Sequence, residues 1–166
     1  MRNRGDGLGG ERFRAGARPA SDGAARAGRA IERPSDDRKD RPRPGGEFHL
    51  FVYGTLRSGG GSSSMLGGSQ LVGSATVEGT LYDLGEYPAL MLYGGTPVEG
   101  EIWRCPAAML WKLDEYEGVE RGLFRRVAIM AGGRPCWAYV AGPKLGQKLT
   151  PDRRLRDGRW AGGAAT

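Results

Sequence analysis

The apolar side chains of this chain are concentrated in one central stretch, and this limits what can fold. Twelve of the 14 aromatic residues in the 166-residue sequence lie between Phe48 and Tyr139. Residues 1–47 contain only four large apolar residues, Met1, Leu8, Phe13 and Ile31. Such a segment buries too little apolar surface to offset its chain entropy. The pattern predicts one domain over residues 48–149, between a disordered N-terminal tail that contains Arg and Gly and a C-terminal tail over residues 150–166.

The net charge of +6 lies outside the predicted domain. Residues 48–149 contain nine Lys and Arg and nine Asp and Glu, so the two tails carry the whole excess. A nucleic-acid-binding domain carries basic charge on its folded body, so we expect no nucleic-acid partner, although weak RNA contact through the Arg-containing tail stays an alternative. No stretch approaches the roughly 18 continuous apolar residues of a membrane span, so we expect no membrane partner.

Cysteine and histidine are scarce in the sequence. Cys105, Cys136 and His49 are the complete set, too few for a Cys-rich zinc site. Two cysteines do not form a disulfide framework in a chain of this size, and the first residues lack the apolar core of a secretory signal. Both features favour a reducing cytoplasm. Residues 5–10 match a GxGxxG pattern, but no strand precedes them, so we expect no dinucleotide site.

Short strands with few helices dominate the predicted secondary structure. One helix is predicted between Pro106, which suits a first helical turn, and Gly118, which suits the position just past the last turn. Alternation and turn residues predict strands over 48–53, 71–84, 89–93, 97–103, 124–130 and 136–141, with turns at 94–95 and 132–133 and a Gly- and Ser-rich loop over 57–68. This pattern predicts an α+β fold, either a small barrel or a curled mixed sheet, flanked by the helix.

Glu117 is the candidate acid–base residue. At about 100° per residue it shares the apolar face of the predicted helix with Leu110 and Leu113, whereas Glu115 points to the opposite side. Burial and the negative end of the helix dipole both act to raise the pKa of a carboxyl at this position. A carboxyl with a raised pKa can take and return a proton near neutral pH. The alternative is a structural Glu that is hydrogen-bonded to a neighbouring strand or exposed at a rim.

The segment Tyr53, Gly54, Thr55 and Leu56 is the candidate anion-binding loop. A strand that ends abruptly at Gly can expose successive backbone N–H groups, which bind a carboxylate without a charged side chain. The Thr55 hydroxyl can add a further hydrogen bond. The alternative is an ordinary exit from a strand into a loop. Tyr87, in a turn before Pro88, is a candidate for the wall of a pocket.

Four segments, in this order, resemble the signature blocks of the γ-glutamylcyclotransferase-like superfamily. The segments are 51–56 (FVYGTL), 81–90 (LYDLGEYPAL), 98–103 (VEGEIW) and 113–118 (LDEYEG). The branches that they resemble most are the γ-glutamylamine cyclotransferases and the avirulence-induced-gene-like plant proteins. The resemblance implies a small mixed β-barrel with flanking short helices.

The resemblance also implies an enzyme, an amine-releasing lyase or acyltransferase. The substrate would be a small γ-glutamyl amine or γ-glutamyl peptide, whose α-amino group attacks its own γ-carbonyl to release 5-oxoproline and a free amine. In the family's pattern the acid–base residue is Glu117, and the backbone amides of 53–56 hold the α-carboxylate. Tyr87 and Phe124 would contact substrate, Phe124 standing where relatives often have Tyr. No cofactor is implied, because closure of a five-membered ring gains from proximity alone. The alternative is a non-catalytic module that binds a small ligand on the same barrel.

Overall fold

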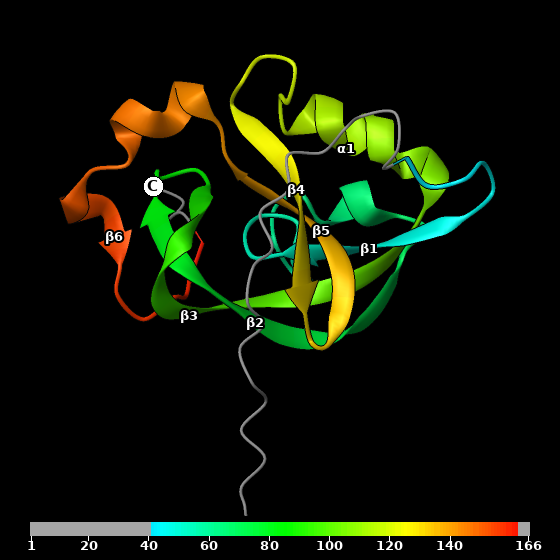
Figure 1. The fold of residues 1–166 in the computed structure, drawn as a ribbon, viewed down its shortest axis with the longest axis horizontal. Coiled ribbons are helices and arrows are strands. Elements are labelled where there is room, and N and C mark those ends of the chain that lie inside the picture. The colour runs from blue at the N-terminus through cyan, green and yellow to red at the C-terminus, as the bar shows by residue number, and fades with distance from the viewer. Residues whose placement is uncertain (1–40, 163–166) are drawn as a thin grey trace, which may run out of the picture.

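The computed structural model describes residues 41–162, which form one six-stranded mixed sheet with a few short helices. The sheet curls around its own inner face (Figure 1). Its order is β4-β5-β1-β3-β2-β6, in which β1 is parallel to β5 and every other neighbouring pair is antiparallel. The strands are β1 (Glu47–Val52), β2 (Gln70–Asp83), β3 (Pro88–Pro106), β4 (Phe124–Ala131), β5 (Arg134–Ala141) and β6 (Arg154–Leu155). This architecture confirms the predicted fold class. The predicted N-terminal tail lies outside the described residues as far as residue 40.

Strand β1 separates two apolar cores. Because side chains alternate along a strand, Phe48, Leu50 and Val52 face one core and Phe51 faces the other. The first core lies beneath the helix α1 (Leu110–Tyr116), and the second fills the inside of the curl. A strand that is buried on both faces has a continuous run of apolar residues in its sequence, and β1 has such a run.

Strand β3 corrects one prediction. The sequence predicted two strands, 89–93 and 97–103, with a chain-reversing turn at 94–95, whereas the structure has one strand over Pro88–Pro106. Both predicted strands pair with the same neighbour, β2, and the extra residues between them bulge out where the register shifts between Gly79 and Thr80. A glycine pair inside a long hairpin therefore marks a bulge here and not a reversal of the chain.

The hairpin of β4 and β5 confirms the prediction of two strands around a turn at residues 132–133. The helix is shorter than the sequence indicated. The predicted helix over 107–117 consists of a 3₁₀ turn (Ala107–Met109) followed by α1. Pro106 is the last residue of β3, with extended backbone, and lies opposite Glu47 of β1 in the strand register. Gly118 follows the helix with φ of +64°, as its position in the sequence indicated.

Two further segments shape the edge of the sheet. The Gly- and Ser-rich loop contains a 3₁₀ helix over Ser63–Leu66, which buries Leu66. The 3₁₀ helix Pro143–Lys148 follows β5 at the end of the predicted domain, and the described part of the predicted C-terminal tail contributes the 3₁₀ helix Pro151–Arg153 and the strand β6. Beyond β6 the indole of Trp160 donates a hydrogen bond of 3.2 Å to the last residue of β2, so these residues pack on the sheet.

Candidate functional site

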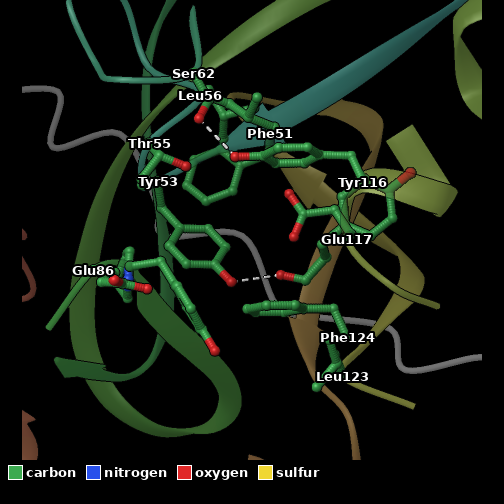
Figure 2. Close-up of a pocket in the computed structure, with 15 residues that line it drawn as sticks. Phe51, Tyr53, Thr55, Leu56, Ser62, Glu86, Tyr116, Glu117, Leu123 and Phe124 are labelled. Atoms are coloured by element: carbon green, nitrogen blue, oxygen red, sulfur yellow. Dashed lines mark hydrogen bonds between the residues drawn. The ribbon is translucent and has the colours of Figure 1, made fainter. Parts of the chain in front are cut away.

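A cavity of about 350 Å³ opens at the end of β1. Figure 2 shows its walls, which come from the loop after β1, the turn before β3, the end of α1 and the start of β4. The structure brings to this one cavity every site residue proposed from the sequence: Tyr53, Gly54, Thr55, Leu56, Tyr87, Glu117 and Phe124. It adds residues for which the sequence analysis proposed no role in a site, among them Ser62, Glu86, Tyr116 and Tyr139.

The parallel pairing of β1 with β5 explains why the cavity lies here. The carboxyl ends of parallel strands meet at the same edge of a sheet, so Tyr53 and Tyr139 are neighbours. The Tyr53 hydroxyl donates to the Tyr139 carbonyl at 2.6 Å, a bond drawn in Figure 2, and accepts from the Leu90 N–H at 3.2 Å. Burial raises the pKa of Tyr53 far above its ordinary value. Tyr53 is therefore a neutral, fixed wall of the cavity.

The loop after Tyr53 presents unused backbone donors. Within residues 41–162 the N–H groups of Gly54, Thr55 and Leu56 donate no hydrogen bond to backbone or side chains. Gly54 also lies tightly against β3, because a Cβ atom at this position would be 2.7 Å from Cγ of Pro88. Only glycine allows the backbone to lie this close to Pro88, and the residues that follow Gly54 then continue along the cavity wall.

Glu117 lies on the other side of the cavity, at the C-terminal end of α1. Its backbone N–H donates to the Leu113 carbonyl at 2.9 Å, which fixes the residue at the end of the helix. The side chain is directed into the space that Tyr53 and Thr55 face from the opposite wall (Figure 2). Burial raises the pKa of Glu117 from 4.5 to about 7. Among the residues the structure describes, no group forms a hydrogen bond or ion pair with this carboxylate. Glu115 is exposed and lies outside the cavity lining.

A buried polar cluster supports the cavity from behind. The Tyr139 hydroxyl donates to Oδ1 of Asp114 at 2.7 Å, and the guanidinium of Arg126 forms an ion pair with Oδ2 of the same carboxylate. The Trp137 ring lies 5.0 Å from the centre of that guanidinium. The cluster ties α1 to β4 and β5. The sequence analysis missed it, although the pairing of Arg126 with Tyr139 follows from the predicted hairpin register.

The buried carboxylate of Glu101 anchors the loop that follows residues 53–56. Glu101 accepts hydrogen bonds from the Ser58 N–H at 2.8 Å, from the Ser58 hydroxyl and from the Trp103 indole at 3.0 Å. Although burial acts to raise it, these bonds and the nearby Arg57 charge hold the pKa of Glu101 below its ordinary value. The signal in the sequence was an acidic residue at an inward position of an apolar strand, and the sequence analysis did not use it.

Tyr116 and Ser62 connect the helix to this loop across the cavity. The Tyr116 hydroxyl donates to Oγ of Ser62 at 2.6 Å, as Figure 2 shows. Tyr116 lines the cavity, but 41% of its surface is exposed. The bond therefore lies at the rim.

Over 41–162, no group of three or more His, Cys, Asp or Glu is placed to hold a metal ion. In the same part of the chain, no helix has the length and apolar character needed to cross a membrane. Cys105 and Cys136 are both buried and free.

Comparison with known proteins identifies the family. The model of the AIG2-like gamma-glutamyl cyclotransferase family matches residues 50–162. The chain belongs to this family. The gamma-glutamylcyclotransferase family protein YtfP of Escherichia coli K12 is 36% identical over 94 residues, which are 56% of this chain and 81% of that protein. The gamma-L-glutamyl-butirosin B gamma-glutamyl cyclotransferase of Niallia circulans is 35% identical over 103 residues, 55% of this chain and 65% of that protein.

Solved structures of family members share the fold. The solution structure of Escherichia coli ytfP superposes with a TM-score of 0.55 and 31% identity, covering 68% of this chain and 96% of that one. The crystal structure of a mouse AIG2-like protein superposes with a TM-score of 0.56, covering 69% of this chain and 88% of that one. The resemblance stated from four sequence segments is thereby confirmed at the level of family and fold.

Proposed function

We propose that the protein is a cyclotransferase that converts a small γ-glutamyl amine or γ-glutamyl peptide into 5-oxoproline and a free amine. One observation carries the proposal: Glu117, whose carboxyl has no partner among the described residues and a pKa raised to about 7, lines the same cavity as residues 54–56, whose backbone N–H groups are unused. Membership of the family supports it, as does the activity in the name of the Niallia relative.

The glutamyl head group is held by backbone groups. The N–H groups of Gly54, Thr55 and Leu56 receive the α-carboxylate, and the Thr55 hydroxyl faces the same space. No Lys, Arg or His lines the cavity in the described part of the chain, so these dipoles are the anion site that the cavity offers. With the carboxylate bound there, the α-ammonium group lies toward Glu117 and forms an ion pair with it.

Glu117 moves the protons of the reaction. Its carboxylate takes one proton from the α-ammonium group, and the neutral amine attacks the γ-carbonyl carbon to form the new C–N bond. Protonated Glu117 then delivers that proton to the departing nitrogen, and the bond between this nitrogen and the γ-carbon breaks. The ring nitrogen releases its remaining extra proton to Glu117, which passes it to the free amine. The sum is a γ-glutamyl amine converted to 5-oxoproline and an ammonium ion, with no water consumed.

The raised pKa suits this exchange. A carboxyl that titrates near pH 7 is ionised often enough to accept a proton and acidic enough to return it. The ring closure is intramolecular, so holding the substrate folded supplies the proximity. A non-catalytic module on the same barrel would bind the glutamyl group equally well, but it has no use for an unpaired carboxyl, which costs stability.

A panel of substrates tests the proposal. Purified protein is incubated with γ-glutamyl-ε-lysine, a γ-glutamyl amino acid and glutathione, and 5-oxoproline is measured by mass spectrometry. We expect turnover of at least one substrate, reduced about 100-fold or more in Glu117→Gln. Glu115→Gln, a change of the same charge on the exposed side of the same helix, is the matched control and retains activity.

The outcomes separate the two functions. A substrate that binds in calorimetry and is recovered unchanged would favour the binding module. Full activity in a folded Glu117→Gln variant would remove Glu117 from the mechanism.

A further inference from the structure

Glu101 lies in the interior of the sheet, at the point where β1 ends. In the strand register of β3 it is opposite Val52, the last residue of β1. Its side chain is 11% exposed, and no other acidic residue of the described chain is as buried. It lies outside the lining of the cavity. Burial of a carboxylate is costly unless donors satisfy it, so the donors around Glu101 indicate what it holds in place.

Both oxygens of this carboxylate hold Ser58. Oε2 accepts from the Ser58 N–H at 2.8 Å, and Oε1 accepts from the Ser58 hydroxyl. Two charge-assisted hydrogen bonds to one residue fix its orientation as well as its position. The Nε atom of Arg57 lies 4.0 Å from Oε1, so the preceding residue is attracted to the same carboxylate. Glu101 therefore determines where the chain lies two residues after Leu56.

The segment between Tyr53 and Ser58 is short and is held at both ends. At its start, Tyr53 is fixed by the two hydrogen bonds of its buried hydroxyl. Between the ends, the Arg57 N–H donates to the Gly54 carbonyl at 3.0 Å and closes a turn. The N–H groups of residues 54–56, the proposed site of the α-carboxylate, lie within this segment. A displacement of Ser58 therefore displaces these N–H groups as well.

We propose that Glu101 is a positioning residue for the anion-binding segment. Through Ser58, its carboxylate holds the N–H groups of residues 54–56 in the arrangement that receives the α-carboxylate of the substrate. The inference rests on the proposed function and extends it to a residue outside the cavity. The α-carboxylate takes no part in the bond changes, so its contacts are the same before and during the reaction. Loss of Glu101 therefore weakens substrate binding and leaves the chemical step unchanged.

Paired substrates test this role. Each γ-glutamyl compound that the protein turns over is compared with its analogue in which a neutral carboxamide replaces the α-carboxylate, measured as a substrate or as a competitive inhibitor. In Glu101→Gln we expect KM for the α-carboxylate substrate to rise about tenfold, while kcat stays within about twofold. The affinity for the carboxamide changes by less than about twofold, because it carries no anion for residues 54–56 to bind. A merely structural role would instead lower the folded fraction, and with it kcat, without changing either KM.

Glu99→Gln is the matched control. Glu99 lies two residues before Glu101 on the same strand, and therefore on the same face of the sheet, but its carboxylate pairs with Arg159 at 2.6 Å. This variant removes the same charge and should keep the KM of the unmodified protein. Ser58→Ala is a second test at an exposed loop position, where folding does not depend on the side chain. It removes one of the two bonds to Glu101 and should raise KM for the α-carboxylate substrate about threefold.

The results distinguish this role from its alternatives. An unchanged KM in Glu101→Gln and Ser58→Ala would overturn the assignment. An equal loss of affinity for the α-carboxylate and carboxamide compounds would overturn it as well, because the effect would then not depend on the anion. Failure of the proposed function gives a different result: the unmodified protein itself then releases no 5-oxoproline from any γ-glutamyl compound, and the assignment falls with it.

Discussion

Replacement of Glu117 by Gln is expected to stabilise the folded protein above pH 7. Glu117 is half-buried by solvent exposure, its carboxyl is unpaired among the described residues, and it lies at the negative end of α1, where desolvation raises its pKa. Its ionised form is therefore less favourable in the folded state than in the unfolded chain. Glutamine has nearly the same shape and carries no charge, so the substitution removes this unfavourable contribution without opening a cavity.

The magnitude follows from the pKa. A group that binds its proton more tightly when folded lowers the free energy of unfolding as the pH rises between the unfolded and folded pKa values, here 4.5 and about 7. At about 1.4 kcal/mol for each pH unit, the total is about 3 kcal/mol. The advantage of Glu117→Gln is therefore small near pH 4.5, grows up to pH 7 and is constant above it. For a domain of this size it corresponds to about 10 °C in Tm.

Urea unfolding at half-unit steps from pH 5 to pH 8.5 measures this difference, with Glu115→Gln as the control. The control carries the same change in charge at an exposed position and should not show the rise between pH 5 and pH 7. The reasoning is refuted if Glu117→Gln is no more stable than the unmodified protein at pH 8. It is also refuted if the difference between them does not depend on pH.

Three further predictions concern the proposed activity and the loops that frame the cavity. First, kcat/KM should rise about tenfold per pH unit below pH 7 and level off above it, because Glu117 of the free enzyme must be ionised. A steady-state pH profile measures this rise. A profile whose midpoint lies near pH 4.5 would contradict the prediction. Second, Glu101→Gln should lower the free energy of unfolding by about 2 kcal/mol at pH 7, because the donors around this side chain lose a charged acceptor. Urea unfolding measures the loss. Since folding lowers the pKa of Glu101, the loss should become smaller below pH 4.5. Third, Tyr116→Phe and Ser62→Ala should each raise KM. The double variant should have no higher KM than either single variant, because both substitutions remove the same hydrogen bond. Additive effects on KM would contradict this prediction.

The sequence predicted well those structural features that depend on the local pattern of residues. The alternation of β1, the hairpin turn at 132–133 and the position of Gly118 after the helix are encoded by neighbouring residues. The face of the helix that carries Glu117 also follows from local periodicity. For the same reason the sequence alone indicated the loop over 53–56 and the end of the helix as candidate site residues.

Features that depend on pairing across long distances in the chain were not predictable. Whether residues 94–95 reverse the chain or bulge out depends on β2, which pairs with both sides of them. The roles of Glu101 and Asp114 depend on Ser58 and Tyr139, which lie far away in the sequence. A single sequence indicates that such a residue is polar and placed among apolar ones, but not which donor will reach it.

The contrast among the inward-facing carboxylates supports the choice of Glu117 as the acid–base residue. Glu101 is satisfied by three hydrogen bonds, and Asp114, only three positions before Glu117, is paired with Arg126 and Tyr139. The negative charge of Asp114 is thus balanced by the neighbouring guanidinium of Arg126. Glu117 has no such partner among the described residues, and burial alone moves its pKa to about 7. Among the described residues, hydrogen-bond donors therefore reach Glu101 and Asp114, and none reaches Glu117, which lines the same cavity as residues 54–56. This is the distribution that proton transfer requires, since a carboxylate with strong donors would hold its charge and could not return a proton near pH 7.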